Sequence, residues 1–480
     1  MTFRLLDLQT FRPSDLQTIY KQMKKETASK TVLDLIGNTP MVEVTHFDTG
    51  KCRLFLKLES HNPGGSIKDR IGLSMINHAE KEGKIKKGGL LVEATAGNTG
   101  LGLALVAAIK GYRLILVIPD KMSREKIMHL KAMGAEIVIT RSDVGKGHPE
   151  YYQDLAMKIA QETPGAFFVD QFSNQANPLA HETTTGPEIY KQLNGEVDAV
   201  VCGVGSSGTV TGLSHFFTKV KPDVDMVIAD PEGSVIAGYI HNGTIKEAGS
   251  WLVEGIGEDF IPGIADFSMV RQAYSIPDKE SLHTARELLQ KEGILAGSSS
   301  GTLLAAALRY CREQETAKNV VTFVCDSGNK YLTKMFDDYW MQDQEMIETN
   351  SRGNLLDMVK RTLEEKEVVF VEPADTLLHA YKKLKLYEVS QLPVIQEGKI
   401  TGIIDQTDIL RAVMSHHNGF NDFVKEWMTT ELKVNQPNDS LKDLVELINQ
   451  GMTPLLCDGE RFIGLITAID VLDHIKRNNG

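Results

Sequence analysis

The sequence has few cysteines and lacks the common short metal-binding motifs. Its five cysteines are odd in number and widely scattered, and they include no C-x-x-C pair. No H-E-x-x-H motif or comparable His/Cys cluster is present either. We therefore expect neither a disulfide framework nor a structural metal site, and reduced thiols in a cytosolic protein instead.

A signal-peptide core and long apolar runs are also missing. Residues 1–9 mix charged residues into their apolar ones, unlike a secretory leader. The longest apolar stretch, Leu101 to Pro119, is interrupted by Lys110, Gly111 and Arg113. It predicts a buried helix followed by a buried strand, not a membrane span, so we expect a cytoplasmic protein without a membrane partner.

The chain has no excess of positive charge. Its 52 basic and 64 acidic residues give a net charge of −12, which argues against nucleic acid as a partner, although a local basic patch stays possible. The charged fraction of 24% and the hydrophobic fraction of 42% are ordinary for a soluble globular protein. The 480 residues suffice for about three domains.

The first two thirds of the chain alternate apolar strands with helical patterns. Residues 1–30 are polar and read as an N-terminal arm, and the alternation fills residues 31–340. It predicts an α/β fold with open, mostly parallel sheets covered by helices. Strands buried on both faces are expected at 114–118, 137–139, 199–202, 226–229 and 320–324, and a helix at 281–290. The polar segment 341–356 reads as an interdomain linker.

An internal repeat fills the rest of the chain. Pro373-Ala-Asp375-Thr-Leu377 opens one unit, and Pro437-Asn-Asp439-Ser-Leu441 opens another. Each continues as a helix, a strand, a short turn, a second strand and a last helix. We expect two α+β domains, residues 357–420 and 421–480, each of which buries a face against the other.

The loop around Lys68 joins an apolar strand, residues 54–59, to a helical pattern that starts near Ile71. Pro63 and two glycines predict a tight turn, and Ser66 is placed to cap the helix. Lys68 then lies at the positive end of the helix dipole, which favours the neutral amine that Schiff-base chemistry requires. The alternative is a solvated lysine on an amphipathic helix.

Three further loops also follow an apolar strand, at the edge of a parallel sheet where ligands bind. Residues 93–100 are rich in hydroxyl, amide and glycine N–H donors, which suit a carboxylate or phosphate; an ordinary helix cap is the alternative. Residues 203–209 form an anion nest, but they also satisfy G-x-G-x-x-G, and Asp230 ends a strand 22 residues after Gly208. A Rossmann dinucleotide site therefore competes there. Ser327 follows the strand 320–324 and is suited to meet a ring nitrogen.

Taken together, these loops resemble the fold-type II pyridoxal-phosphate enzymes of the cysteine synthase/cystathionine β-synthase family. Matching stretches run through almost all of residues 32–340. They include Ile36-Gly-Asn-Thr-Pro40, Asn62–Arg70, Gly97–Gly100, Asp170–Phe172, Asn177-Pro178, His181, Gly205–Thr209, Glu254–Pro262 and Gly297–Gly301. The repeat resembles a pair of CBS domains, a Bateman module.

The resemblance implies a role for each loop. Lys68 would bind the cofactor covalently and later act as the base at the substrate Cα. The remaining cofactor contacts would come from Asn98, Gly205, Ser206, Ser207, Gly208, Thr209 and Ser327. The substrate would meet Thr95, Ala96, Gly97, Thr99, Gln171 and Gly255.

The implied reaction is β-replacement, in which serine and homocysteine give cystathionine and water, with side reactions that form hydrogen sulfide also compatible. A serine opposite the pyridine nitrogen does not favour the pyridinium, which suits elimination and thiol addition better than transamination. Glu254–Phe260 and the paired CBS domains favour the cystathionine β-synthase branch. The alternatives are a cysteine synthase using O-acetylserine and sulfide, a serine dehydratase, or an adenosyl-nucleotide sensor with a vestigial catalytic fold.

Several features depart from the family or leave its properties open. The family commonly has Tyr after His181, whereas this chain has Glu182, so the substrate pocket is expected to differ in detail from the family's. Residues 1–30 contain no Cys or His, so no haem is expected. S-adenosylmethionine or an adenine nucleotide would bind the second CBS copy at Thr467 and Asp470, because Asp405 in the first copy repels an anion; a purely structural module is the alternative. The resemblance also implies a homodimer or higher homo-oligomer.

Overall fold

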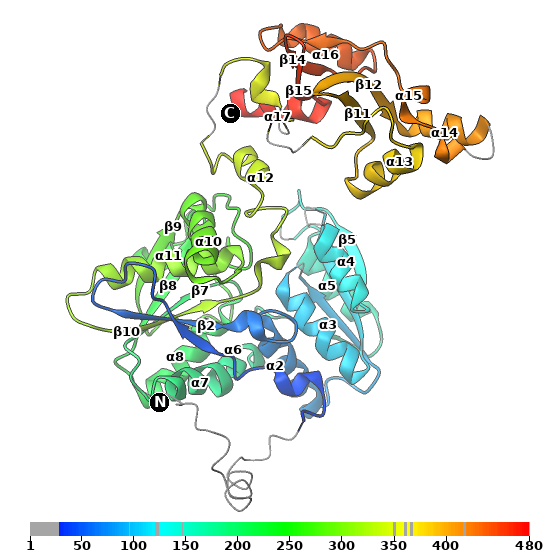
Figure 1. Ribbon diagram of the computed structural model, residues 1–480. Coiled ribbons are helices and arrows are strands. Elements are labelled where there is room, and N and C mark those ends of the chain that lie inside the picture. The colour runs from blue at the N-terminus through cyan, green and yellow to red at the C-terminus, as the bar shows by residue number, and fades with distance from the viewer. Residues whose placement is uncertain are drawn as a thin grey trace, which may run out of the picture. The chain divides into compact units, whose positions relative to one another are not determined.

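The computed structural model describes residues 28–479 except 96, 121–123, 146, 349–351, 360–361, 365–367 and 416–418. Most of the predicted arm of residues 1–30 therefore lies outside the described residues. The chain divides into two compact units, Met1–Phe336 and Asp337–Gly480 (Figure 1). The predicted linker boundaries, 341–356, remain a prediction; the helix α12 (Asp338–Asp343) overlaps their start.

A six-stranded sheet forms the larger part of the first unit. Its order is β1-β2-β10-β7-β8-β9, and all neighbours are parallel except β1 and β2. The strands are β1 (Met41–Glu43), β2 (Arg53–Leu58), β7 (Ala199–Gly203), β8 (Asp225–Pro231), β9 (Val270–Ile276) and β10 (Asn319–Val324). The predicted strands at 199–202, 226–229 and 320–324 are confirmed, and all three lie inside the sheet, as their continuous apolar runs indicated.

A second sheet is parallel throughout and has the order β5-β4-β3-β6. Its strands are β3 (Leu90–Ala94), β4 (Arg113–Pro119), β5 (Glu136–Thr140) and β6 (Ala166–Phe168). The predicted strand at 114–118 lies within β4. The strand predicted at 137–139 exists as β5, but the prediction that both of its faces are buried was wrong. β5 is an edge strand, and the side chain of Ile139 is 56% exposed.

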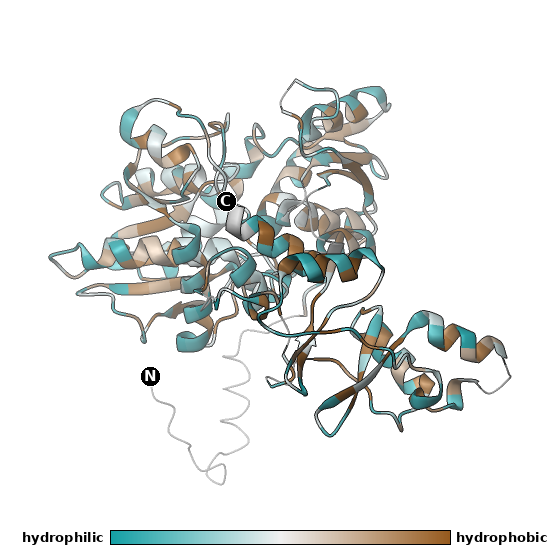
Figure 2. Cartoon of the chain, turned by 90° about the horizontal axis from the view of Figure 1, so that it is seen from above, coloured by the Kyte–Doolittle hydropathy of each residue, from teal (hydrophilic) through white to brown (hydrophobic). Residues whose placement is uncertain are grey.

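Helices of mixed hydropathy surround both sheets, and most show polar and apolar stretches side by side (Figure 2). They are α2 (Lys68–Lys81), α3 (Asn98–Lys110), α4 (Arg124–Ala132), α5 (Tyr152–Glu162), α6 (Ala176–Ala180), α7 (Gly186–Gln192), α8 (Gly208–Val220), α9 (Ile236–Asn242), α10 (Asp278–Glu292) and α11 (Ser298–Arg312). The predicted helix 281–290 lies within α10. Every helix in the described part of the chain is too short or too polar to cross a bilayer.

Two glycines let α2 and α3 pack backbone against backbone. A Cβ added at Gly72 would lie 2.8 Å from the carbonyl carbon of Gly102, and one added at Gly102 would lie 2.7 Å from the Lys68 carbonyl oxygen. No larger residue fits either position without moving a helix. The first turn of α2 is therefore held directly against α3.

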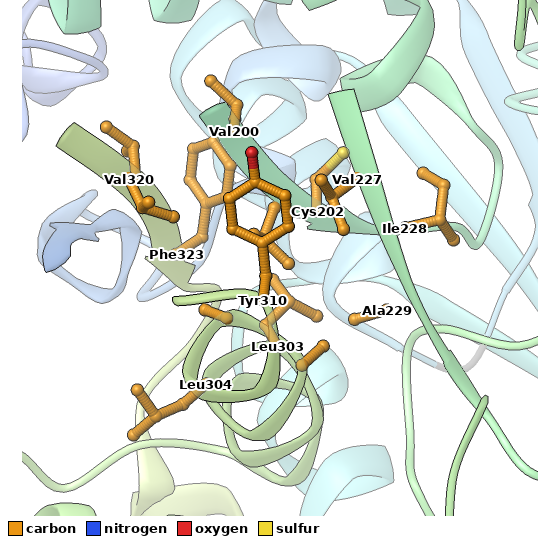
Figure 3. Close-up of a cluster of buried hydrophobic side chains, with 14 of the residues drawn as sticks. Val200, Cys202, Val227, Ile228, Ala229, Leu303, Leu304, Tyr310, Val320 and Phe323 are labelled. Atoms are coloured by element: carbon orange, nitrogen blue, oxygen red, sulfur yellow. The ribbon is translucent and has the colours of Figure 1, made fainter. Parts of the chain in front are cut away.

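The main core lies between the six-stranded sheet and α11. Figure 3 shows side chains of β7, β8 and β10 packed against those of α11. Val200, Val227 and Leu304 are completely buried there. The hydroxyl of Tyr310 reaches the edge of this core and donates to Asp225 Oδ2 (2.6 Å). The burial of these apolar side chains stabilises the ends of the strands and therefore also the positions of the loops that follow them.

The second unit contains the predicted repeat. Both copies consist of a helix, two antiparallel strands and a second helix. The first copy has α13 (Leu377–Leu386), β11 (Gln391–Gln396), β12 (Lys399–Asp405) and α14 (Gln406–Ser415), and the second has α16 (Leu441–Asn449), β14 (Leu455–Asp458), β15 (Arg461–Leu465) and α17 (Ala468–Asn479). Between them lie α15 (Val424–Trp427) and β13 (Val434–Asn435), and β13 pairs with β14.

Candidate active site

The loop between β2 and α2 places Lys68 at the first position of the helix. Asn62 Nδ2 donates to both the carbonyl and a carboxylate oxygen of Glu59 (2.9 Å each), which fixes the turn. Gly65 has a φ of +77°, which strongly favours glycine. Ser66 Oγ accepts the N–H of Lys68 (3.3 Å). The N-cap residue is Ile67, however, and it makes no side-chain cap bond, so the predicted cap at Ser66 was wrong by one position. The sequence therefore specifies this turn locally.

A buried ion network holds the same helix start. Arg70 Nε and Nη2 donate to the two carboxylate oxygens of Glu59 (2.7 and 2.8 Å), and Nη1 donates to Glu188 (2.7 Å). Lys57 Nζ lies 2.8 Å from the other carboxylate oxygen of Glu188. Lysine is almost never fully buried unless it is paired, and Lys57 is fully buried because this network supplies its partner.

Burial favours the neutral form of the Lys68 amine. It lowers the pKa of Lys68, and the attraction of Cys325, Asp326 and Glu258 only partly opposes that effect. Burial acts here in the same direction as the helix dipole that the sequence suggested. Among the described residues, Lys68 Nζ has no hydrogen-bond or ion-pair partner. A neutral, unpaired amine is a nucleophile and a base.

Ser327 lies beside this loop because β10 and β2 are parallel neighbours in the sheet. The Ile67 N–H donates to the Cys325 carbonyl (2.9 Å), and the Ser327 N–H donates to the Gly65 carbonyl (3.3 Å). Ser327 is partly exposed, and its Oγ accepts the N–H of Asn329 (3.3 Å). Its hydroxyl proton is thereby left to donate elsewhere.

Asn98, at the start of α3, belongs to a polar cluster beside the Lys68 loop. Its Nδ2 donates to Asp326 Oδ2 (2.8 Å), and its Oδ1 accepts from Lys330 Nζ (2.5 Å). Tyr331 Oη also donates to Asp326 Oδ2 (2.9 Å), while the buried Asp326 Oδ1 has no hydrogen-bond partner among the described residues. Asp326 and Lys330 were not predicted as site residues. The only sequence signal was their position near Ser327, after a strand.

Residues 205–209 form the predicted nest between β7 and α8. Ser207 adopts the left-handed conformation (φ 62°), and the first backbone bond of the helix runs from the Thr211 N–H to the Ser207 carbonyl. The N–H groups before Thr211 therefore point out of the helix end, where an anion binds. Asn177 Nδ2 supports the nest by donating to Ser206 Oγ (2.9 Å). A Cβ added at Gly208 would lie only 1.8 Å from Asn177 Oδ1.

His181 also supports the nest. Its Nε2 lies 3.3 Å from Thr209 Oγ1, and its Nδ1 lies 2.9 Å from Thr185 Oγ1. Burial lowers the pKa of His181 well below its usual range, so the ring is neutral. The neighbouring Glu182 pairs instead with Lys219 (2.5 Å) on α8. Where the family commonly has Tyr, this chain has Glu182, which therefore adds a salt bridge to α8.

The predicted substrate loop is tied to the nest by Gln171. Thr99 Oγ1 donates to Gln171 Oε1 (2.7 Å), and the Gln171 carbonyl accepts from Asn177 Nδ2 (2.7 Å). Thr95 Oγ1 accepts the Gly97 N–H (3.3 Å). Ala96 lies outside the described residues. The substrate loop and the nest are thus linked through Asn177 and Gln171.

Gly255 lies against the nest from another segment of the chain. A Cβ added at Gly205 would lie 2.8 Å from the Gly255 carbonyl oxygen, and the Gly257 N–H donates to the Val204 carbonyl (2.8 Å). Gly255 has a φ of +87°, and a Cβ added there would meet nothing within 4 Å. This glycine leaves open space at the edge of the site.

Asp230, the acidic residue that a dinucleotide site would need, makes a structural hydrogen bond instead. Asp230 is fully buried, and its Oδ2 accepts the N–H of Ala237 (2.8 Å) in the first turn of α9. A carboxylate used in this way does not reach a ribose in solvent. The G-x-G-x-x-G match is therefore a phosphate nest without the acidic partner of a Rossmann site.

In the second unit, Thr467 and Asp470 bond to each other. The Thr467 N–H and Oγ1 both donate to Asp470 Oδ2 (2.8 and 2.5 Å). In the first copy, Asp405 Oδ1 accepts the N–H groups of Thr407 (2.7 Å) and Asp408 (2.9 Å). The hydroxyl and carboxylate predicted for the second copy are thus adjacent, and the first copy has a carboxylate at the corresponding place.

The comparisons with known proteins agree with this geometry. Residues 32–326 match the family described as "Pyridoxal-phosphate dependent enzyme", and residues 359–415 and 424–477 each match the CBS domain. Cystathionine β-synthase of Dictyostelium discoideum is 35% identical over 95% of this chain and 94% of its own length. Cysteine synthase A of Salmonella typhi is 41% identical over 64% of this chain and 96% of its own length.

A solved structure gives the same result for the first unit. The crystal structure of a hydrogen sulfide-producing enzyme from Fusobacterium nucleatum is similar, with a TM-score of 0.59 and 37% identity, over 64% of this chain and all of that one. The chain therefore belongs to the cystathionine β-synthase family of pyridoxal-phosphate-dependent enzymes and carries two CBS domains.

Proposed function

We propose that this protein condenses L-serine with L-homocysteine by β-replacement to give L-cystathionine and water. The observation that carries the proposal is the Lys68 amine, which has no partner among the described residues and whose pKa burial lowers, beside the predicted ligand-binding loops. The similarity to a cystathionine β-synthase extends through the CBS domains. We also propose a cytoplasmic homodimer; sedimentation of the purified protein tests the dimer, and cell fractionation tests the location.

The donor set fits pyridoxal phosphate. The nest of Gly205 to Thr209 offers outward N–H groups and hydroxyls for the phosphate, and Lys68 offers the amine for the covalent link. Asn98 has one Nδ2 hydrogen left for the ring hydroxyl after its bond to Asp326. Ser327 offers a hydroxyl to the ring nitrogen. When bound, the cofactor supplies an electron-accepting ring conjugated to the substrate Cα.

The protein's own groups then position the substrate and move protons. The substrate carboxylate would bind the loop of Thr95, Ala96, Gly97 and Thr99 together with Gln171, and Gly255 leaves room for the second substrate. Lys68 removes the proton from Cα, because its lowered pKa makes the neutral amine available as a base. Ser327 has no charge to offer the ring, which favours elimination over reactions that need a long-lived carbanion.

Replacement of Lys68 by Ala tests this assignment directly. The purified protein should be yellow, and Lys68→Ala should lose the visible absorbance of the bound cofactor. A colourless native protein, or one that binds NAD instead, would contradict the proposal. A Lys68→Ala variant that keeps the absorbance would exclude Lys68 as the covalent link.

The second candidate is a cysteine synthase that uses O-acetylserine and sulfide. It is favoured by the 41% identity to cysteine synthase A over the catalytic part. Product formation from serine plus homocysteine, compared with O-acetylserine plus sulfide, separates the two activities. Pyruvate released from serine alone would indicate a dehydratase, and sulfide released from cysteine would indicate the side reactions that form hydrogen sulfide.

For the CBS domains we propose one ligand site, at Thr467 and Asp470, for S-adenosylmethionine or an adenine nucleotide. The adjacent hydroxyl and carboxylate of the second copy support it, whereas Asp405 repels an anion in the first copy. Calorimetry with S-adenosylmethionine and with ATP, repeated on Asp470→Ala, tests binding. A purely structural module would bind neither, and a nucleotide sensor without catalysis would bind one and lack the activity.

A further inference from the structure

Glu258 stands at the edge of the active site without an assigned role. It follows Gly255 and Gly257, both with a φ of +87°, on the loop between α9 and β9. Its N–H donates to Ser234 Oγ (3.0 Å), and its carbonyl accepts the N–H of Val235 (3.0 Å). The backbone is therefore fixed, and the side chain projects toward the nest: its Oε1 lies 3.9 Å from a Cβ added at Gly205.

The carboxyl of Glu258 is surrounded by groups that keep it protonated. Burial raises its pKa to about 8, the carboxylates of Asp259 and Asp230 add to the rise, and only the attraction of Lys68 opposes it. From α5, Tyr152 also faces Glu258. Within the described part of the chain, its carboxylate has no hydrogen-bond or ion-pair partner. The raised pKa favours the protonated form of this carboxyl at neutral pH.

The proposed reaction requires such a proton. The β-substituent of serine is a hydroxyl, which leaves poorly unless it is protonated as its bond to Cβ breaks. Lys68 takes the Cα proton, so a second group that acts as the acid divides the two proton transfers between two residues. A carboxyl whose pKa is raised toward neutral pH is well suited to that second transfer.

We propose that Glu258 is the acid that protonates the departing hydroxyl of serine and the base that later receives the proton of the incoming thiol; this inference rests on the proposed function. In the first half, the Cα–H bond breaks and its proton goes to the Lys68 amine. Its electron pair forms the Cα–Cβ double bond. The Cβ–O bond breaks, its electron pair stays on oxygen, and the Glu258 proton completes a water molecule.

In the second half, the thiol gives its proton to the Glu258 carboxylate as sulfur bonds to Cβ. The proton on Lys68 returns to Cα. Both groups are then back in their starting states, and the net change is serine plus thiol to thioether plus water. No oxidant or further reactant is needed.

The test is Glu258→Gln assayed with serine and with β-chloroalanine, each plus homocysteine. Glutamine is nearly isosteric and carries the same zero charge at neutral pH, so the fold is expected to persist. General acid catalysis contributes about 10²–10⁴-fold, so kcat/KM for serine should fall by at least about 100-fold. Chloride needs no proton to leave, so the rate with β-chloroalanine should fall much less, by about tenfold or less.

Two further measurements complete the design. Glu258→Asp keeps an acid and should recover part of the serine activity, while Glu247→Gln, at an exposed position on the same loop, should leave the ratio of the two substrates nearly unchanged. In apoprotein labelled with carbon-13 at glutamate side-chain carboxyls, the resonance absent from Glu258→Gln should titrate near pH 8, as its raised pKa of about 8 requires.

Three results would overturn the inference. They are equal losses with both substrates, no loss with serine, or a carboxyl that titrates near pH 4.5, the ordinary value for glutamate. Failure of the native protein to perform β-replacement with any of these substrates would instead refute the proposed function.

Discussion

The two units differ in whether their functional polar side chains have hydrogen-bond partners within the protein. In the first unit, the Lys68 amine has no partner among the described residues, although the backbone around it is fixed by Ser66, Glu59 and Arg70. In the second unit, Thr467 and Asp470 satisfy each other. A group held in place but unpaired is ready to react, whereas a mutually bonded pair must exchange an existing bond for a ligand.

The largest loss of stability is expected when the buried ion network around Arg70 in the first unit is broken. Arg70→Ala leaves Glu59 buried without its partner and should lower the free energy of unfolding by about 3–5 kcal/mol. The matched change in the second unit is Lys399→Ala, which breaks an exposed ion pair with Glu460 and should leave the free energy of unfolding nearly unchanged. Urea unfolding of both variants measures the difference, and equal losses would contradict the comparison.

A smaller loss is expected from Gly208→Ala in the nest. The added methyl collides with Asn177 Oδ1 and should cost about 1–3 kcal/mol of stability and weaken cofactor binding. Gly238→Ala in α9 is the control, because a Cβ there meets nothing within 4 Å. Thermal unfolding and cofactor titration measure both. Unchanged cofactor affinity in Gly208→Ala would show that the nest tolerates displacement.

The buried Glu93 should make the stability of the first unit depend on pH. Its carboxylate accepts the N–H groups of Ala94 (2.9 Å) and Gln171 (3.2 Å), and burial raises its pKa to about 8. The folded state therefore holds a proton that the unfolded state releases near pH 4.5. This contribution is complete below pH 4.5 and is lost as the pH rises toward 8, by at most about 1.4 kcal/mol per pH unit.

Unfolding of Glu93→Gln in urea at about pH 6 and about pH 8 checks this sign. The variant should lose less stability than the native protein over that range, with the remaining slope due to groups such as Glu258, whose pKa is also raised to about 8. A native protein that gains stability over the same range would contradict the prediction.

The smallest effect is expected in the second unit. Thr467→Val keeps the shape of the side chain but removes its hydrogen bond to Asp470, and should cost about 1 kcal/mol. Calorimetric unfolding of the full chain measures it, with serine and homocysteine turnover without added ligand as the control. A larger loss of turnover than of stability would show that the pair acts on the active site.

Some site residues were predictable because local patterns determine them. Pro63, Gly64 and Gly65 after an apolar strand predict the turn, and Ser66 predicts the helix start at Lys68.

Other features depend on residues far apart in the chain. The resemblance named Asn98 and Ser327 from their loops, but Asp326 is 228 residues from the Asn98 it bonds, and nothing in its neighbourhood in the sequence indicates that pairing. The burial of Lys57 was equally unpredictable, because the partner that neutralises it, Glu188, comes from a distant helix.

The sequence by itself therefore determined the alternation of strands and helices, the repeat, the family and the position of the reactive lysine. Those features depend on patterns within about 20 residues or on motifs that stay contiguous. The tertiary structure decided which groups are buried together. It buried Lys68, which lowers the pKa of its amine more than the neighbouring charges raise it, and it brought Glu258 close enough for its charge to act on that lysine. The physical reason is that desolvation depends on neighbours from distant segments, which no local pattern specifies.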